Sequence, residues 1–564
     1  MKILFEEYLY ETTLLSNIIG ERYYFPINPT QSKITFVGYY FNPHADESKG
    51  DSIIIFPKVF INKEFKAFDY FAPEDLISPT LEISKQLKAN GTDKIIFEMA
   101  TWLYRAIQQF NKRHKENIIS ENQQLNEVIS NLNSRTSTEL DIILSLLKFH
   151  KENQSLFTFI SKSSNSQQNK VNWDKTINKS QMIIQDNQPF YLDVNSKKKK
   201  INEEEELLIL FYSTLNYVKT KYNFDFQLSQ KYELIKNNQF ETLLRRGCRH
   251  LKNIKYKYYS DKMLALYNLL YTFFERSERV QAKQQLEEIL LIKDFNIVFE
   301  DMIDDLIGDL AENNPRLSKL KNHADGKQID HIYRYKSLIV EDDIYFIGDS
   351  KYYKPNTTTG ANSKAKQFTY AKNIIQNEMN LFNDGKLENG LKYRDNETEG
   401  YNITPNFFIS AFINDKFDFL SADLRDNGKL ICQQHFENRL FDRDTLFVQS
   451  YNINFLFVIS AYISKNVALK VNFKENTRKL FRDNLITFLN EKYVFYIIKP
   501  LSSLNSDEFI TKYFRILNGK VYKPSQFKEE LLFASERKSA YENHKDILNK
   551  IKDDTSSIEE YSIK

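Results

Sequence analysis

The sequence of 564 residues has few cysteines: Cys248 and Cys432 are the only two, which excludes a disulfide framework and a cysteine-rich zinc site. Long apolar runs are also missing, since the longest, from Phe455 to Ile463, is far too short to span a bilayer. The first residues mix acidic and apolar side chains, unlike a secretory signal. We therefore expect a soluble protein of the reducing cytoplasm.

An excess of charge of one sign is lacking as well, because 78 lysines and arginines stand against 75 aspartates and glutamates. Nucleic-acid-binding proteins often have a larger basic excess. A nuclease, however, needs acidic side chains where it binds metal and only a local basic surface where it binds phosphate. Net charge therefore neither supports nor excludes binding to nucleic acid.

Several common catalytic motifs are absent. Each Gly-Lys pair lacks the glycine that a nucleotide-binding P-loop requires five residues earlier; these pairs begin at Gly326, Gly385, Gly428 and Gly519. The eight histidines show no zinc-ligand spacing, and no Gly-x-Ser-x-Gly nucleophile motif occurs. The chain thus lacks the signatures of an NTPase, a zinc enzyme and an α/β-hydrolase.

The length exceeds that at which one hydrophobic core keeps growing, so we expect about two to four domains. Residues 1–165 combine strand-like runs with a helix that begins near Thr92, which predicts an α+β domain. Residues 166–290 are predicted to be a mainly helical region that connects domains or contacts DNA. Residues 291–500 mix strands and helices, and residues 501–564 are predicted to form a charged helical tail. The expected fold class is mixed α/β.

Within residues 291–500, three segments have clear patterns. A helix is predicted from about Lys364 to Phe382. Strands are predicted at residues 406–413 and 454–463, where apolar and β-branched side chains dominate.

The strongest chemical signal is a predicted β-hairpin that begins at Asp330. After an acidic turn at residues 341–343, the chain returns through a second strand and brings Asp349 level with Asp330. Lys351 lies two residues beyond Asp349, so both side chains project from one face of the strand. Metal-dependent phosphodiester hydrolysis needs carboxylates that hold Mg²⁺ beside a group that orients water. This pattern predicts a nuclease site.

Flanking residues extend this site. Glu300 lies on an amphipathic helix upstream, although Asp301, Asp304 and Asp305 on the same helix leave the identity of the acid open. Downstream, one helical face carries two residues that are available to close over the site, Gln367 and Tyr370. Ser350 and His331 are expected to point to the opposite face of the hairpin, so His331 is not predicted as a ligand, whereas the backbone carbonyl of Ser350 is available as one.

A plainer interpretation competes with this one. An Asp-Ser-Lys triplet at a strand end is usually solvated, and an exposed Asp–Lys pair contributes little to stability. The ordered set of helix, hairpin and second helix favours the nuclease interpretation, because a surface strand has no need of these flanking residues.

A basic segment lies apart from the hairpin, in the predicted helical region. Interleaved basic and aromatic residues there could follow a DNA backbone, and an ordinary exposed helix face remains an equal alternative. The candidate nucleic-acid contacts are Arg245, Arg246, Arg249 and Lys252, together with Tyr370 near the hairpin.

The residues of the predicted site resemble the PD-(D/E)xK nuclease superfamily. More narrowly, the chain resembles McrC-like subunits of LlaJI-type restriction systems, from about residue 170 to 465. The resemblance is carried by FNIVFEDMIDDLIGD, QIDHIYRY and GDSKYYK, and extends to residues 173–177 and 435–444. Two departures are Ile329 in place of proline before the first acid and Asp349 in place of glutamate.

The resemblance implies that residues 291–500 form a restriction-endonuclease-like domain with a central mixed sheet flanked by helices. It implies Asp330 and Asp349 as ligands of Mg²⁺, with Mn²⁺ as a substitute, and Lys351 as the catalytic lysine. Glu300 would assist the metal or the water, and Gln367 would support the site from the following helix.

Because the chain has no P-loop, the resemblance implies a separate McrB-like AAA+ GTPase that translocates double-stranded DNA and on which residues 1–165 would dock. Two alternatives remain open: a non-catalytic DNA-binding adaptor that activates a motor, and a solitary RecB-like repair nuclease. The intact set of Asp330, Asp349 and Lys351 argues against the adaptor. The N-terminal region and the segment around Trp173 favour a restriction (phage-defence) endonuclease over the repair enzyme.

Overall fold

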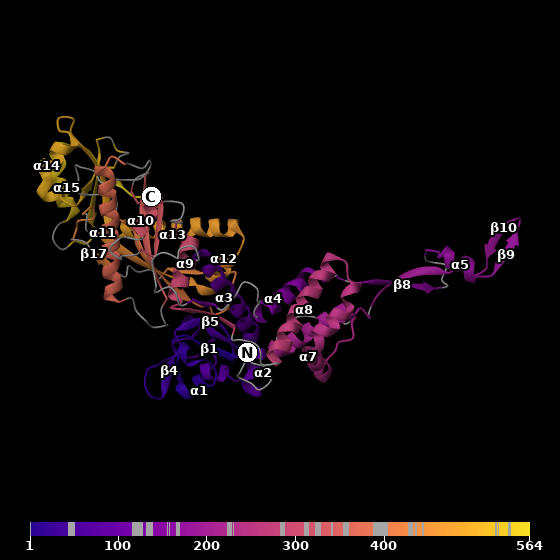
Figure 1. The fold of residues 1–564 in the computed structure, drawn as a ribbon. Helices are drawn as coiled ribbons and strands as arrows, with labels where there is room; N and C mark the ends of the chain where they lie inside the picture. Colours follow the sequence, from indigo (N-terminus) through magenta and orange to yellow (C-terminus); the bar gives the residue numbers. More distant parts are fainter. Residues whose placement is uncertain are drawn as a thin grey trace.

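The fold is described from a computed structural model. The described residues are 2–42, 51–114, 128–130, 139–154, 156, 158–164, 170–202, 204–222, 228, 231–281, 288–309, 315–321, 329–339, 342–352, 360–386, 404–426, 432–434, 437–442, 445–524, 527, 529–539 and 543–564. Figure 1 shows mixed α/β units at one end, a bundle of helices beside them and a thin arm that projects from the bundle. Within these ranges, every helix is too short or too polar to cross a membrane.

A five-stranded sheet organises the N-terminal unit, in the order β1-β6-β5-β12-β7. Strands β5 and β6 and helix α3 confirm the strands and the helix predicted in residues 1–165. Strand β12 enters this sheet from far along the chain, from within the range predicted to be mainly helical. Its central residues are buried on both faces, so it lacks the alternation that marks a strand in the sequence. The elements are β1 (Lys2–Phe5), β5 (Phe36–Asn42), β6 (Asp51–Phe56), β7 (Val128–Ser130), β12 (Glu288–Lys293), a small sheet of β2 (Leu9–Glu11), β3 (Phe25–Pro26) and β4 (Gln31–Lys33), and helices α1 (Thr12–Ser16), α2 (Leu81–Ala89) and α3 (Thr92–His114).

A helical unit and a projecting arm follow. Four helices share one apolar core; three of them lie within the range predicted to be mainly helical, whereas the first comes from earlier in the chain. They are α4 (Glu139–Glu152), α6 (Glu206–Tyr222), α7 (Asn237–Ile254) and α8 (Asp261–Gln281). The arm is a two-stranded stalk, β8 with β11, that leads to helix α5 and hairpin β9–β10. Its elements are β8 (Phe159–Ser164), α5 (Trp173–Lys179), β9 (Met182–Gln185), β10 (Gln188–Tyr191) and β11 (Ser196–Ile201).

A buried charge network joins the helical unit to the N-terminal sheet. The carboxylate of Glu139, on α4, pairs with Arg276 of α8 at 3.2 Å and with Lys221 of α6 at 3.0 Å. It also accepts a hydrogen bond from Ser52 of β6 at 3.0 Å. Arg276 in turn pairs with Glu288 of β12 at 2.8 Å. One carboxylate therefore connects two helices of the bundle to the sheet.

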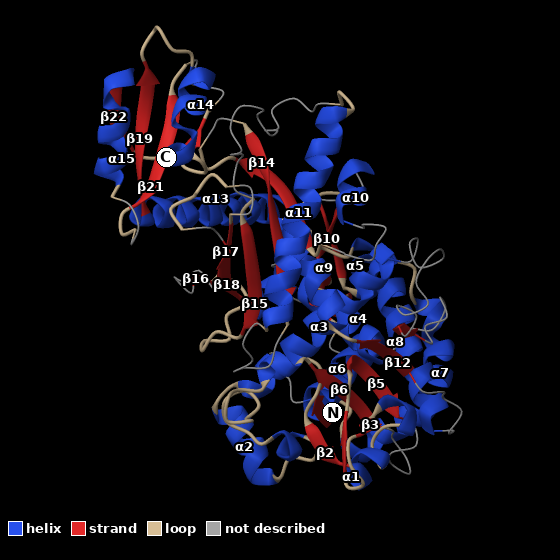
Figure 2. Cartoon of the chain, turned by 90° about the vertical axis from the view of Figure 1, so that its left-hand side faces the viewer, coloured by secondary structure: helices blue, strands red, loops and turns tan. Residues whose placement is uncertain are grey.

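A central mixed sheet organises the next unit, in the order β13-β14-β15-β18-β16, with β17 also paired to β18. Helices α10 and α11 pack on one face, and α9, α12 and α13 pack on the other; Figure 2 shows α11 lying across the strands. The elements are α9 (Asn296–Ile307), α10 (Pro315–Lys321), β13 (His331–Lys336), β14 (Asp343–Lys351), α11 (Ala361–Asn383), β15 (Asn406–Phe412), β16 (Leu424–Asp426), β17 (Cys432–Gln434), β18 (Leu446–Asn454), α12 (Phe455–Ile463) and α13 (Val467–Lys492).

The structure confirms most of the elements predicted in this unit and contradicts one of them. The hairpin, the helix from about Lys364 and the strand at residues 406–413 are confirmed. The strand predicted at residues 454–463 is wrong, because this segment is helix α12. Its side chains are buried on nearly every side, and such a continuous apolar run looks the same in a buried strand and a buried helix. The side chain of Asn454 caps the helix by accepting from the backbone N–H of Leu456.

The C-terminal unit corrects the prediction of a helical tail. Two helices do form after residue 501, but they cover a four-stranded sheet, β20-β21-β19-β22. Exposed charged residues dominate the helices, whereas the short strand β21 is buried along its whole length and supplies much of the core. The elements are β19 (Tyr493–Pro500), α14 (Ser506–Leu517), β20 (Val521–Tyr522), β21 (Leu531–Glu536), α15 (His544–Ile551) and β22 (Thr555–Tyr561).

Glycine is required at one position beside the predicted site. A Cβ on Gly348 of β14 would lie 2.1 Å from the ring of Phe407 on the neighbouring strand β15. That ring is buried and packs on the ring of Phe481, with the two ring centroids 4.8 Å apart, so it has little room to move. We expect Gly348→Ala to lower the free energy of unfolding by about 1–3 kcal/mol through overpacking, as measured by chemical denaturation. Gly360→Ala is the control, because a Cβ there meets no atom within 4 Å; equal stability of the two variants would contradict the prediction.

Candidate active site

The hairpin brings its three predicted residues together. Strand β13 pairs antiparallel with β14 so that His331 lies opposite Gly348, which places Asp330 level with Asp349. The backbone N–H of Ser350 donates to Oδ2 of Asp330 at 3.1 Å. On the α10–α11 face of the strand, the Lys351 ammonium forms an ion pair with Asp349. The predicted register and the shared face of Asp349 and Lys351 are therefore confirmed.

Three carboxylates share this end of the hairpin. Burial raises the pKa of Asp330 well above its usual value, and the charges of Glu300 and Asp349 raise it further. Burial also raises the pKa of Glu300 to about 7, with the charge of Asp349 adding to the effect and the Asn296 amide opposing it. Because like charges raise one another's pKa only when they are close, Glu300 belongs to the same cluster.

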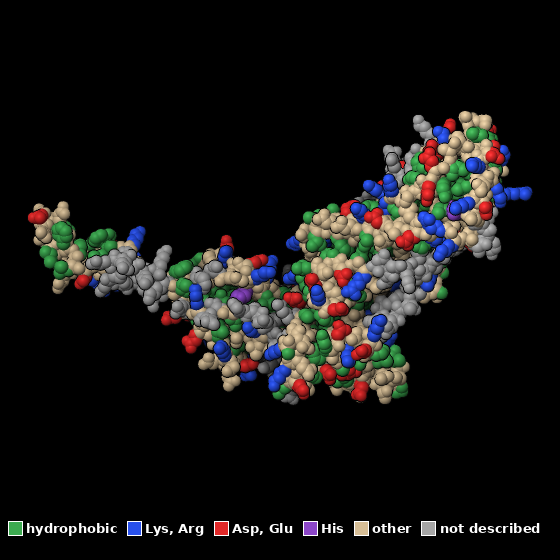
Figure 3. Space-filling view, turned by 180° about the vertical axis from the view of Figure 1, so that it is seen from behind, with side chains coloured by type: hydrophobic (Ala, Val, Ile, Leu, Met, Phe, Trp, Pro, Cys, Tyr) green, Lys and Arg blue, Asp and Glu red, His purple; other side chains and the backbone are tan. Residues whose placement is uncertain are grey.

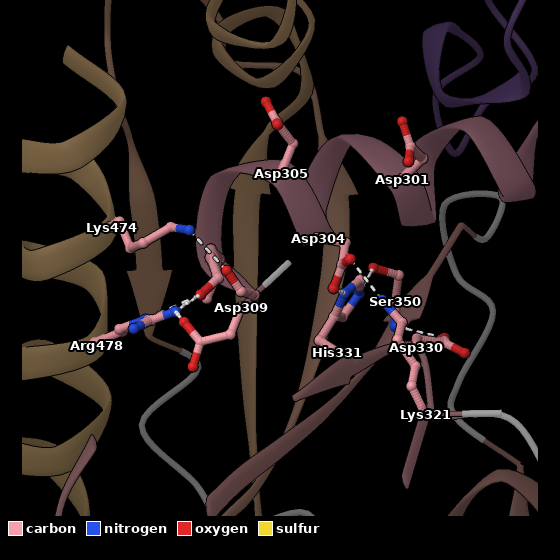
Figure 4. Close-up of polar contacts among 12 residues, drawn as sticks. Asp301, Asp304, Asp305, Asp309, Lys321, Asp330, His331, Ser350, Lys474 and Arg478 are labelled. Carbon is pink, nitrogen blue, oxygen red and sulfur yellow. Dashed lines mark hydrogen bonds and ion pairs between the residues drawn. The ribbon is translucent and has the colours of Figure 1, made fainter. Parts of the chain in front are cut away.

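The acid of helix α9 can now be identified. Asp301 accepts a hydrogen bond from Tyr462 at 2.5 Å, and Asp305 pairs with Lys470 at 2.7 Å. Asp304 pairs with Lys321 at 2.5 Å on the side of the helix that faces β13. Figure 4 shows Asp301 and Asp305 pointing away from Asp304 and the hairpin. The three aspartates are thus engaged in ion pairs and hydrogen bonds, and Glu300, bonded to its own helix neighbour Asn296, is an acid of this helix that interacts with the charge of Asp349.

Polar side chains contact one another on the other face of the hairpin (Figure 4). His331 and Ser350 form a hydrogen bond of 2.5 Å between Nε2 and Oγ, and both side chains are buried. Nδ1 of His331 lies 3.5 Å from Oδ1 of Asp304. The prediction that Ser350 and His331 point away from the site is confirmed. Their mutual bond was not predicted, although residues at nearby paired positions on one face of a hairpin are a signal for it.

Helix α11 covers the face of β14 on which Asp349 lies. Burial raises the pKa of Tyr370 to about 12, with the charges of Asp330 and Asp349 adding to the effect, so its hydroxyl lies near the carboxylates. Gln367 lies one turn earlier on the same helical face and is fully buried. Neither atom of its amide has a hydrogen-bond partner in the part of the chain that the structure describes. The helical face that the sequence predicted for these two residues is therefore buried in the structure.

These residues fit a hard divalent cation. Among the described residues, no three His, Cys, Asp or Glu side chains stand in an arrangement that could hold a metal ion. The carboxylates of Asp330 and Asp349 nevertheless lie close together, since the charge of Asp349 adds to the effect of burial in raising the pKa of Asp330. The unsatisfied amide of Gln367 offers an oxygen that can bind the metal and an N–H group that can donate a hydrogen bond to bound water. Carboxylate and amide oxygens are the ligands that Mg²⁺ accepts.

The lack of a hydrogen-bond partner for the Gln367 amide allows us to predict the effect of replacing this residue. A buried polar group without a partner destabilises a protein by about 1–3 kcal/mol. We expect Gln367→Met to raise the free energy of unfolding by about 1 kcal/mol while it lowers the rate of DNA cleavage. Denaturation and cleavage assays measure both effects, with Gln376→Met on the exposed side of the same helix as the control. A loss of stability in Gln367→Met would show that the amide has a structural role instead.

The other candidate nucleic-acid contacts lie elsewhere. The basic residues of α7 are exposed in the helical unit, and Figures 1 and 2 both separate α7 from the hairpin. They are Arg245, Arg246, Arg249 and Lys252. Tyr370, by contrast, is buried at the carboxylate cluster. The structure thus brings Tyr370 to the site and leaves the α7 residues as a separate surface.

Comparison with known proteins identifies the family of this chain. The family model described as LlaJI restriction endonuclease matches residues 81–423, which is more than half of the chain. Among curated proteins, none matches the chain. The matched range runs from α2 through the helical unit and the arm to β15, and it includes Glu300, Asp330 and the Asp349–Lys351 strand. The chain therefore belongs to the LlaJI restriction endonuclease family, which makes it a nuclease of a restriction system that acts on DNA.

Proposed function

We propose that this chain hydrolyses DNA phosphodiester bonds with Mg²⁺ at the hairpin of β13 and β14, in a domain of the PD-(D/E)xK type. The observation that carries the proposal is that Asp330 lies close to the buried carboxylate of Asp349, beside the ammonium of Lys351. The mixed sheet with helices on both faces is consistent with that type of domain. We expect Mn²⁺ to substitute for Mg²⁺.

Each residue has a distinct part in the proposed reaction. Asp330 and Asp349 would hold the metal, which when bound supplies positive charge to the phosphate oxygens. Lys351 orients the attacking water and offsets the negative charge that develops on the phosphate. Glu300, with a pKa of about 7, accepts a proton from that water near neutral pH. Gln367 donates a hydrogen bond from α11 and keeps the water in line with the leaving oxygen.

We further propose that cleavage depends on a separate McrB-like AAA+ GTPase in the cytoplasm. The docking role of residues 1–165 is part of this proposal, and the arm that follows them supports it. The arm projects from the molecule with apolar side chains in contact with solvent (Figure 3), which is unfavourable unless a protein partner covers them. These exposed side chains are Phe159, Trp173, Ile177, Met182, Ile183, Ile184, Phe190 and Leu192.

The test is a plasmid-cleavage assay with the purified chain, with and without Mg²⁺, the motor protein and GTP. We expect cleavage only when all three are present, and we expect a chelator to abolish it. Cleavage by the chain alone with Mg²⁺ would favour the solitary nuclease. Stimulation of the motor by the chain without any cleavage would favour the adaptor.

A further inference from the structure

A basic groove lies apart from the hairpin, between α3, α4 and the turn after α12. It has a volume of about 890 Å³. Five of its lining residues are cationic and one is acidic. The cations are Arg105, Lys112, Lys148, Lys151 and Lys465, and the acid is Glu152. Figure 1 places α3, α4 and α12 where the helical unit meets the two larger sheets.

The cations line facing walls. Arg105 and Lys112 are seven residues apart on α3, which is two turns, so they lie on one face about 10 Å apart along the helix axis. Lys148 and Lys151 are three residues apart on α4 and share a face too. Lys465 follows α12 at the end of the groove. All five side chains are exposed.

Little negative charge balances these cations. Glu152 pairs with Lys148 at 3.8 Å, and the pair is largely exposed. In the described ranges, the structure shows no ion pair for the other four. Cations gathered in a concave surface create a positive potential that concentrates a polyanion. Because the net charge of the chain is near zero, a polyanion would bind at local basic surfaces such as this groove.

The groove is also connected to the helix that carries Glu300. Next to Lys112 on α3, Arg113 pairs with Asp301 of α9 at 3.3 Å. Gln109, which lines the groove, donates from Nε2 to the backbone carbonyl of Tyr462 at 2.9 Å, and the hydroxyl of Tyr462 bonds to Asp301. The groove wall is therefore held directly against α9.

We propose that this groove binds the sugar–phosphate backbone of the DNA substrate at a distance from the bond that is cut. The proposal rests on DNA as the substrate, which family membership shows, and does not require any role for the hairpin residues. The groove has the chemistry of backbone recognition, since lysine and arginine side chains neutralise phosphates without reading the bases. Binding there is independent of base sequence and sensitive to salt.

The experiment uses the full chain, duplex DNA and no divalent metal, so that binding is measured without cleavage. The variant is Lys112→Ala with Lys151→Ala, one lysine from each wall. The matched control is Lys545→Ala with Lys550→Ala, two exposed lysines on α15. Fluorescence anisotropy at several salt concentrations gives the slope of log affinity against log salt. Each lost phosphate contact lowers that slope by about 0.9, so we expect the groove variant to lower it by roughly 2 and the control to leave it unchanged.

The outcomes separate the groove from the hairpin. A groove variant with the affinity and slope of the wild-type chain would overturn the proposal. So would an unchanged slope with weakened binding to the motor, which would assign the groove to an acidic protein surface. Because binding is measured without metal and without cleavage, a failure of the proposed hydrolysis would leave the result at the groove intact. Equal melting temperatures of the variants confirm that they are folded.

Discussion

Asp349→Asn is expected to lower the rate of DNA cleavage by at least about a thousand-fold while DNA binding stays intact. The substitution keeps the size of the side chain but removes the charge that pairs with Lys351 and, in our proposal, holds Mg²⁺. Metal stabilisation of the reacting phosphate contributes several kcal/mol, and each loss of about 1.4 kcal/mol is a tenfold loss of rate. Single-turnover cleavage of a labelled duplex at saturating Mg²⁺ measures the effect.

The matched control is Asp343→Asn, the same substitution at the other end of the same strand. Asp343 is partly exposed and pairs with Arg334 at 3.1 Å, away from the carboxylate cluster. We expect this variant to cleave at the wild-type rate. Full activity in Asp349→Asn would remove the hairpin from the proposed reaction, whereas equal losses in both variants would point to damage to the strand as a whole.

The largest effect on stability is expected for Glu139→Gln. Its carboxylate is buried between Arg276 and Lys221, and the neutral amide would leave both cations without that charge partner. Breaking a buried ion pair from one side destabilises a protein by about 3–5 kcal/mol. Because Arg276 still pairs with Glu288 in this variant, we expect the free energy of unfolding to fall by an amount near the lower end of this range, about 3 kcal/mol. Thermal unfolding measures this loss. Glu152→Gln, at an exposed position on the same helix, should change stability by less than about 0.5 kcal/mol.

The same carboxylate gives stability a pH dependence. Burial alone would raise the pKa of Glu139, but Arg276 and Lys221 outweigh burial and hold the pKa well below its usual value of 4.5. A lowered pKa in the folded state means that the stabilisation is present above pH 4.5 and is lost as the pH falls further. The difference in melting temperature between the wild-type chain and Glu139→Gln should therefore shrink in acid. A constant difference between pH 7 and pH 3 would show that the charge of Glu139 is not the cause.

Local patterns predicted the parts of the fold that depend on neighbours in the sequence. The hairpin of β13 and β14 followed from two strand-like runs and an acidic turn, and the shared face of Asp349 and Lys351 followed from the two-residue period of a strand. The shared helical face of Gln367 and Tyr370 followed from the helical period in the same way. Apolar runs are ambiguous where burial is complete, which is why the sequence predicts a strand at residues 454–463 and places the start of β12 in a helical region.

By itself, the sequence determined the candidate residues and the family resemblance of this protein: two acids and a lysine at hairpin spacing, no P-loop and a resemblance to LlaJI-type restriction nucleases. Only the tertiary structure decided that Glu300 interacts with the charge of Asp349, whereas its aspartate neighbours form ion pairs with α3, α10 and α13. It also decided the basic groove, whose cations come from three separate segments. The physical reason is range: side-chain periodicity acts over a few residues, whereas charge pairing and concavity arise between elements that are distant in the chain.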